Sequence, residues 1–231
     1  MAFVLVHGGG FTASCWDPLI PFLNDTVRAV DLPGRGGRPA DLKKVTIAES
    51  VDAVVEEIVA IDQTVVLVGH SMAGITLPAV VGRVPERIGK VVFVSCVVPA
   101  DGECLYEALD PAMKDVADEA QNSDQRDTGK LDDDVAAKVF CNDMNDEQTK
   151  FTLDRMVPEA IQLMREPVSL SGLRHQVPRV YVRLSLDAIV APSHQDRMIA
   201  NMGGAEIFEL DAGHMAMISR PRELAAILNS L

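Results

Sequence analysis

Short runs of consecutive apolar residues alternate along this chain with longer segments in which apolar residues recur every three or four positions. The runs are rich in valine and too short for helices, so they predict buried strands, whereas the longer segments predict amphipathic helices that pack on them. The predicted strands are Ala2–Val6, Thr26–Val30, Val65–Val68, Lys90–Ser95, Pro178–Leu184 and Ala205–Leu210. Strands that alternate with helices predict an α/β fold with a mostly parallel sheet of about six strands, flanked by helices on both faces.

Four segments outside the strands carry the helical pattern. In the segment that precedes the third strand, valine and isoleucine recur at helical spacing from Val51 to Val59. The predicted helices are Cys15–Asn24, Ile47–Ile61, Pro192–Met202 and Pro221–Leu228. A further helix is predicted to begin at Ala73, directly after the third strand.

The alternation stops after the fourth predicted strand and resumes only at the fifth. We therefore predict a core, residues 1–98 and 174–231, with a helical cap, residues 99–173, inserted after the fourth predicted strand. Residues 101–150 hold 15 acidic and 5 basic side chains, so most of the negative charge of the chain lies in this insert. Its acidic clusters, such as Asp132–Asp134, are interpreted as a solvated face rather than a cation site.

Methionine and aromatic side chains are frequent in the same insert. Flexible side chains of this kind suit an adaptable apolar pocket above the core. Packing within the cap itself would use the same residues, so both interpretations stay open. The residues concerned are Met113, Phe140, Met144, Phe151, Met156, Leu163 and Met164.

Composition narrows the classes of partner. The chain has 231 residues, 48% of them hydrophobic, which suits one large α/β domain. Its formal net charge of −13 argues against nucleic acid and anionic membrane surfaces as partners. No apolar run is long enough to span a membrane, and the N-terminal segment lacks the basic region and cleavage site of a signal peptide. The four cysteines form no Cys-x-x-Cys pair and the five histidines have no metal-type spacing, so we expect a cytoplasmic protein with free thiols and without a metal or cofactor.

The stretch Val65–Gly74, Val-Val-Leu-Val-Gly-His-Ser-Met-Ala-Gly, joins a buried strand to a helix through a tight turn of small residues. A serine on such a turn is exposed above the edge of the sheet and acts as the nucleophile in enzymes that have a nucleophile elbow. We therefore predict that Ser71 is a nucleophile and that the Met72 N–H, at the helix start, binds an oxyanion. The usual pattern is Gly-x-Ser-x-Gly, and Ala73 replaces its last glycine here. The alternative is a serine that only caps the helix.

Three glycines, Gly8–Gly10, follow the first strand and leave backbone N–H groups free in a turn. In the nucleophile-elbow architecture a loop after an early strand supplies the second oxyanion donor, so we predict that the Gly9 N–H is the partner of the Met72 N–H. The alternative is a phosphate-binding loop, but the Gly-Lys-Ser/Thr ending of such loops is absent here. His7 is interpreted as a structural residue that bonds the loop backbone.

A serine nucleophile needs a base, and the base needs an acid that orients it. In this architecture they follow in the order serine, acid, histidine, and Ser71, Asp187 and His214 each lie just past the end of a predicted strand. Asp211 is the alternative acid, but it lies three residues before His214 on the same loop and cannot easily reach the imidazole from behind. The remaining histidines that do not follow the last strand are His70, His175 and His194.

These motifs resemble the α/β-hydrolase superfamily, and within it the plant methylesterase and hydroxynitrile lyase family with its bacterial relatives. The matching stretches are Phe3-Val4-Leu5-Val6-His7-Gly8 with Trp16, Leu67-Val68-Gly69-His70-Ser71 and Ala212-Gly213-His214-Met215-Ala216-Met217. The lyases of this family carry a threonine and a lysine where this chain has Gly8 and Met215, so the resemblance implies hydrolysis rather than cyanohydrin cleavage. Related dehalogenases and epoxide hydrolases use an aspartate nucleophile at the position of Ser71.

The residues and the resemblance together predict a serine hydrolase that cleaves a small carboxylic ester through an acyl-enzyme. Two alternatives stay open: cofactor-free lyase or carbon–carbon bond chemistry on the same fold, and a small-molecule receptor without catalysis. Dimers are common among the relatives, which leaves a homodimer open as the assembly. The predicted substrate-binding residues are Gly8, Phe11, Met113, Phe140, Met144, Met156 and Met215.

Overall fold

The computed structural model describes residues 1–122 and 131–231. Within these residues six strands form one sheet in the order β2-β1-β3-β4-β5-β6, and every neighbouring pair is parallel. The strands are β1 (Ala2–Val6), β2 (Val27–Val30), β3 (Val65–His70), β4 (Ile88–Val94), β5 (Arg179–Leu184) and β6 (Glu206–Leu210). The predicted α/β fold class is therefore confirmed.

The strand β1 and residues 65–69 of β3 carry only apolar side chains or glycine, because both faces of the sheet are covered there. Every residue of β1 and β3 is buried. The strand β2 lies at one edge of the sheet and its residue Arg28 is exposed, so the expectation that Thr26–Val30 is fully buried is wrong. An edge strand has only one neighbour and can leave part of its length to solvent.

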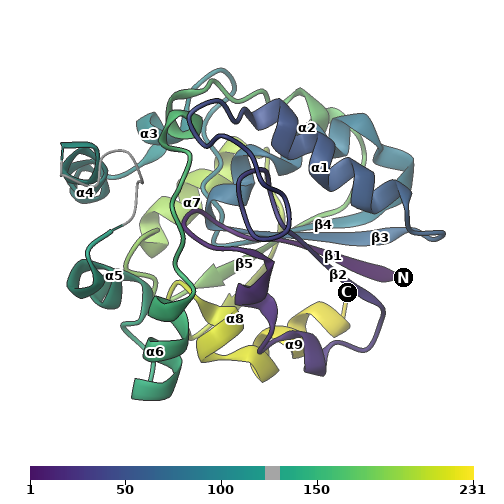
Figure 1. Ribbon diagram of the computed structural model, residues 1–231. Coiled ribbons are helices and arrows are strands. Elements are labelled where there is room, and N and C mark those ends of the chain that lie inside the picture. Colours follow the sequence, from purple (N-terminus) through teal and green to yellow (C-terminus); the bar gives the residue numbers. More distant parts are fainter. Residues whose placement is uncertain (123–130) are drawn as a thin grey trace.

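Helices cover both faces of the sheet (Figure 1). They are α1 (Ile47–Val59), α2 (Leu77–Arg83), α7 (Pro192–Asn201), α8 (Ala216–Ser219) and α9 (Pro221–Asn229), with the 3-10 turns η3 (Ser71–Ile75) and η4 (Pro85–Arg87). In the view of Figure 1, α1 and α2 lie above the sheet and α8 and α9 below it, and α7 packs into the same apolar cluster as α1 and α2. A capping box between Thr46 and Glu49 starts α1 at the predicted residue. None of the helices in the described ranges is long and apolar enough to cross a membrane.

The segment Cys15–Asn24, predicted as one short helix, forms two 3-10 turns instead, η1 (Ala13–Trp16) and η2 (Ile20–Phe22). Pro18 and Pro21 explain the difference, because a proline cannot donate the backbone hydrogen bond that continues an α-helix. The apolar side chains of the segment still join the core cluster on the face of α8 and α9. The hydrophobic pattern was therefore sufficient to predict burial but not the helix type.

The insert after β4 is helical. Its elements are α3 (Leu105–Ala108), α4 (Pro111–Asn122), α5 (Asp133–Phe140), α6 (Asp146–Asp154), and the 3-10 turns η5 (Ile161–Arg165) and η6 (Ser171–Arg174). In Figure 1, α4, α5 and α6 lie beyond the end of the sheet at which the strands finish. The two ends of the insert pair with each other between Cys104 and Pro167. The turn η6, which the predicted cap includes, packs against α2 where Gly172 meets Gly82, so it belongs with the core layer.

Candidate active site

Ser71 is the first residue of η3 and stands on the sharp turn that follows β3. Its φ of 54° lies in the left-handed region, which is strained for a serine and is typical of a nucleophile elbow. Small residues meet behind the turn: a methyl group at Gly69 would lie 2.9 Å from Ala73 Cβ, and one at Gly74 would lie 2.2 Å from the Val97 carbonyl oxygen. Ala73 can replace the usual glycine because Gly69, which faces it, has no side chain.

The side chains of Ser71, His214 and Asp187 form one hydrogen-bonded line. His214 Nδ1 lies 2.7 Å from Asp187 Oδ2, and His214 Nε2 lies 2.8 Å from Ser71 Oγ. A carboxylate only accepts hydrogen bonds, so Nδ1 carries the imidazole proton and Nε2 accepts from the Ser71 hydroxyl. Asp211, the alternative acid, accepts a hydrogen bond from Ser185 instead. The arrangement therefore brings together the three residues that follow β3, β5 and β6.

Both oxygens of the Asp187 carboxylate accept hydrogen bonds. The Ser95 hydroxyl, at the end of β4, donates to Oδ2 at 2.6 Å, and the N–H groups of Ile189 and Val190 donate to Oδ1 at 2.7 and 2.8 Å. Burial by itself would raise the pKa of this carboxyl, but His214 and the donors outweigh burial and hold the pKa below its ordinary value. Asp187 is therefore ionised beside His214 and can stabilise an imidazolium.

His70 packs behind His214 and holds its backbone. The ring centroids lie 4.5 Å apart, and His70 Nε2 lies 2.8 Å from the His214 carbonyl oxygen. Because a carbonyl only accepts, Nε2 carries the proton. Burial lowers the pKa of His70 well below its ordinary value, so the ring stays neutral. His70 thus fixes the position of His214 without adding charge to the site.

His7 holds the backbone of the glycine loop. Its Nδ1 lies 2.8 Å from the Gly8 carbonyl oxygen, and its Nε2 accepts the Leu32 N–H at 3.2 Å, so Nδ1 carries the proton. Burial lowers the pKa of His7 to about 4, which keeps the ring neutral. In a trans peptide the N–H points away from the carbonyl, so the bond to Gly8 directs the Gly9 N–H to the opposite side. His7 therefore bonds the loop backbone, as the sequence predicts.

The residues that carry the two predicted oxyanion donors lie next to each other. A methyl group at Gly9 would lie 3.0 Å from Met72 Sδ and 3.7 Å from Met72 Cβ. Met72 is the second residue of η3, so its N–H is among the first amides of a helical turn, which have no partner within the turn. A methyl group at Gly8 would lie 2.8 Å from Ser71 Cβ. The glycine loop and the start of η3 therefore flank the serine.

Comparison with known proteins identifies this architecture. The profile of the alpha/beta hydrolase family matches residues 3–227. The chain belongs to the alpha/beta hydrolase family. It is 30% identical to norfluorocurarine synthase 2 of a Strychnos species, with 98% of this chain and 93% of that protein covered, and 27% identical to methylesterase 18 of Arabidopsis thaliana, with 98% and 95% covered. Among solved structures it resembles an extracellular alpha/beta-hydrolase from a Paenibacillus species, with a TM-score of 0.90 and 23% identity over 100% of this chain and 98% of that one.

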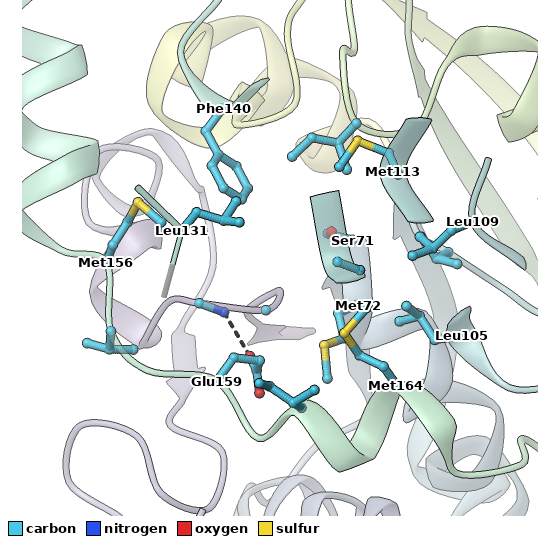
Figure 2. Close-up of a pocket in the computed structure, with 17 residues that line it drawn as sticks. Ser71, Met72, Leu105, Leu109, Met113, Leu131, Phe140, Met156, Glu159 and Met164 are labelled. Atoms are coloured by element: carbon cyan, nitrogen blue, oxygen red, sulfur yellow. Dashed lines mark hydrogen bonds between the residues drawn. The ribbon is translucent and has the colours of Figure 1, made fainter. Parts of the chain in front are cut away.

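The predicted relationship to the plant methylesterases is thereby confirmed. A cavity of about 160 Å³ in this hydrolase borders Ser71 (Figure 2). Three of the predicted substrate-binding residues, Met113, Phe140 and Met156, lie on its wall. Among the described residues that line it, only Ser71 and Glu159 have polar side chains, so the cavity is an apolar chamber beside the serine. The described ranges hold no group of three histidine, cysteine, aspartate or glutamate residues that could bind a metal ion.

Four other predicted substrate-binding residues lie outside the wall of this cavity. Phe11 and Met215 are buried in the core, where Phe11 packs edge-on against Phe140 with ring centroids 5.3 Å apart. Met144 packs against the same apolar cluster, and Gly8 lies close to Ser71, whose Cβ is 2.8 Å from the point where a Cβ of Gly8 would stand. For Phe11, Met144 and Met215 this placement reflects that an apolar or flexible side chain suits a core and a cavity equally well, and the sequence pattern does not separate the two.

Glu159 and Ser95 contribute to the site although the sequence pattern did not indicate them. Glu159 lies in the insert, in a segment without strand or helix pattern. Ser95 follows a buried strand, as Ser71 does, and polar residues at the ends of parallel strands are a usable signal for site residues. Ser95 could therefore have been found from its position at a strand end, whereas no sequence pattern in the insert points to Glu159.

Proposed function

We propose that this protein hydrolyses small uncharged carboxylic esters through an acyl-enzyme formed on Ser71. The broader class, an ester-cleaving alpha/beta hydrolase, follows from the family and from its esterase relatives. The observation that carries the proposal is the line Ser71–His214–Asp187, whose two hydrogen bonds measure 2.8 and 2.7 Å. Such a line is the arrangement that activates a serine hydroxyl.

In the proposed reaction, Ser71 Oγ attacks the ester carbonyl carbon and its proton passes to His214 Nε2. The carbonyl oxygen takes up the negative charge and accepts hydrogen bonds from the N–H groups of Gly9 and Met72. Asp187 stabilises the imidazolium. His214 then gives its proton to the alkoxide oxygen as the ester C–O bond breaks, which leaves the acyl group on the serine. A water molecule repeats the sequence, releases the carboxylic acid and restores the serine hydroxyl.

The lining of the cavity supports a substrate without charge. A charged group placed against apolar side chains loses its hydration without gaining a partner, and the charge of Glu159 on the same wall is already paired with Arg35. A cavity of about 150 Å³ with a comparable lining holds a benzene ring. We therefore infer an acyl or alcohol group of about that size.

Cofactor-free lyase chemistry is the second candidate, because one relative is named as a synthase. Two positions favour hydrolysis. At Gly8 even a methyl group would lie 2.8 Å from Ser71 Cβ, so the threonine of the related lyases has no room on this backbone. Met215 is buried and uncharged, where those lyases carry the lysine that favours departure of cyanide.

The test compares the wild type with Ser71→Ala on a panel of short and aromatic esters, together with labelling by a fluorophosphonate and mass spectrometry. We expect labelling of Ser71 in the wild type and a loss of about 10⁴–10⁶-fold in kcat in Ser71→Ala. Ser185→Ala is the control, since this exposed serine also follows a strand and its hydroxyl pairs with Asp211. Equal rates in wild type and Ser71→Ala would remove Ser71 from the mechanism. Turnover without fluorophosphonate labelling would favour lyase chemistry. Binding of a small molecule without turnover would favour a receptor.

A further inference from the structure

An ion pair lies beside the oxyanion loop, and no step of the proposed hydrolysis uses it. Arg35 lies in the loop after β2, and Glu159 lies in the insert between α6 and η5. Their side chains are 2% and 10% exposed, and Arg35 Nη2 donates to Glu159 Oε1. Arg35 also donates to the Pro33 carbonyl oxygen at 3.1 Å, a bond within its own loop that holds the guanidinium in place. Burying both charges costs desolvation that their attraction does not clearly repay, so stability alone is a weak reason for the pair.

Glu159 and its neighbour Val157 bind Gly10 from the insert. Glu159 Oε2 accepts the Gly10 N–H at 2.8 Å, the hydrogen bond drawn in Figure 2, and the Val157 N–H donates to the Gly10 carbonyl oxygen at 2.9 Å. The other carboxylate oxygen accepts from Arg35 and, at 2.6 Å, from the Ala160 N–H. Both backbone groups of Gly10 and both oxygens of Glu159 are therefore engaged.

These contacts matter because the glycine loop has no side chains that could limit its backbone. Gly10 has a φ of 74°, and consecutive glycines can adopt many conformations. The bond to Glu159 directs the Gly10 N–H toward the insert. Glu159 Oε2 also lies 3.2 Å from the point where a Cβ of Gly9 would stand, so the carboxylate borders Gly9 itself. His7 fixes the peptide that precedes Gly9, and Glu159 fixes the peptide that follows it.

We propose that Glu159, anchored by Arg35, is a positioning residue that holds the Gly9 amide in place for the oxyanion. The inference rests on the proposed hydrolysis, since it concerns the oxyanion formed in that reaction. This role makes the insert part of the oxyanion-binding machinery, because the insert contributes the residue that fixes the glycine loop. Loss of this contact slows the chemical step and leaves the binding of the ester nearly unchanged.

Two double variants separate the hydrogen bond from the ion pair. R35M with E159Q removes both charges and keeps an amide oxygen for the Gly10 N–H, although the Ala160 N–H then loses its acceptor, whereas R35M with E159L removes the charges and both acceptors. We expect the glutamine variant to retain kcat within about threefold, and the leucine variant to lose about 10–100-fold in kcat with KM nearly constant. Glu166→Leu is the matched control, because Glu166 in the same insert accepts the Ile47 N–H at 3.0 Å, away from the loop.

The inhibition constant of a trifluoromethyl ketone with an apolar chain would not change if Glu159 only stabilised the fold. Its carbonyl carbon forms a bond with Ser71 Oγ, the serine proton passes to His214, and the resulting hemiketal oxyanion occupies the site of the two amides. We expect its inhibition constant in the leucine variant to rise by the factor by which kcat falls. In the Glu166→Leu control we expect both values to stay at the wild-type level.

Equal kcat values in the glutamine and leucine variants would overturn the inference, and so would a loss confined to KM. Failure of a fluorophosphonate to label Ser71 in the wild type would overturn the proposed hydrolysis, and the inference with it. If circular dichroism shows that the leucine variant does not fold, Glu159→Asp takes its place, because its shorter side chain withdraws the carboxylate from Gly10 and keeps the charge. The same loss in kcat at constant KM is expected, and an unchanged kcat would count against the inference.

Discussion

The Ser95 hydroxyl donates to Asp187 Oδ2 at 2.6 Å, the same oxygen that faces His214. Ser95 has a φ of 41°, so it shares the left-handed backbone of Ser71. The two serines follow the neighbouring strands β4 and β3. Adjacent strand ends therefore supply the proposed nucleophile, Ser71, and a donor that holds Asp187 in the same hydrogen-bonded line.

We expect Ser95→Ala to lower both stability and rate. The variant removes a hydrogen bond to a buried carboxylate, which is worth about 2 kcal/mol. For a chain of this size that loss corresponds to a fall in Tm of about 4–8 °C. With one donor fewer, the pKa of Asp187 moves upward and its hold on His214 loosens, and we expect kcat to fall by about tenfold. Thermal melting and ester hydrolysis on the same preparation measure the two effects.

Ser219 offers the matched control for this substitution. It is also a buried serine, but its hydroxyl has no hydrogen-bond partner among the described residues. Ser219→Ala should therefore leave Tm and kcat near the wild-type values. A Ser95→Ala variant that behaves like Ser219→Ala would show that the donor to Asp187 has no influence on the site.

His7 makes stability depend on pH. Burial lowers the pKa of His7 from 6.5 to about 4, whereas the unfolded chain binds this proton near the ordinary value. The contribution is fully present above pH 6.5 and is lost as pH falls through 4, because only the unfolded state takes up the proton in between. Between pH 8 and pH 4.5 we expect the wild type to lose about 2–3 kcal/mol more in unfolding free energy than His7→Asn. Urea unfolding at several pH values measures the difference.

His7→Asn keeps an amide donor for the Gly8 carbonyl but cannot take up a proton in this range. It removes the acceptor of the Leu32 N–H, so it lowers stability at every pH, and only the difference in slope bears on the prediction. His70, whose pKa is also lowered by burial, acts in the same direction and leaves a residual slope in the variant. His175→Asn, at an exposed position, is expected to keep the wild-type slope. Parallel curves for wild type and His7→Asn would contradict the prediction.

The proposed catalytic line could be anticipated from the sequence because topology alone sets where it forms. Ser71, Asp187 and His214 each follow a strand, and parallel strands all end at the same edge of the sheet. Their separation along the chain is therefore no obstacle. Glu159 could not be found in this way, since its partner Gly10 lies 149 residues away and their contact depends on how the insert folds back.

The limits of the sequence pattern are visible at single residues. The methionine and aromatic content of the insert predicts Met144 and Met156 as pocket residues, and both are at least partly buried, but only Met156 borders the cavity. Hydrophobicity drives burial without regard to which surface covers the side chain. The segment Cys15–Asn24 fails for a local reason, because its prolines remove backbone donors while its apolar spacing stays helical.

The contact between Gly69 and Ala73 is expected to behave as a coupled pair. A methyl group at Gly69 would lie 2.9 Å from Ala73 Cβ and 2.6 Å from Leu77 Cδ1, so Gly69→Ala should cost about 2–3 kcal/mol and lower kcat by shifting Ser71. Ala73→Gly should cost only about 0.5–1 kcal/mol. In the double variant the smaller residue at position 73 leaves room for the methyl group at position 69. We therefore expect the double variant to lose less unfolding free energy than the two single variants lose together. Strict additivity in urea unfolding would show that the two residues do not constrain each other.

Phe140 should set the size of the group that the cavity accepts. Its ring borders the cavity and packs between Phe11 and His214, with centroid distances of 5.3 and 5.8 Å. Phe140→Ala widens the chamber at the side of the histidine, so we expect kcat/KM for a bulky acyl ester relative to an acetyl ester to rise by about 10-fold or more. Phe151→Ala is the control, because the Phe151 ring does not border the cavity. Instead it packs against the Arg155 guanidinium, whose Cζ lies 3.5 Å from the centroid of the ring. Its ratio of kcat/KM values should stay unchanged even where its Tm falls. The same shift in both variants would mean that loosening of the insert, rather than the removed ring, had altered specificity.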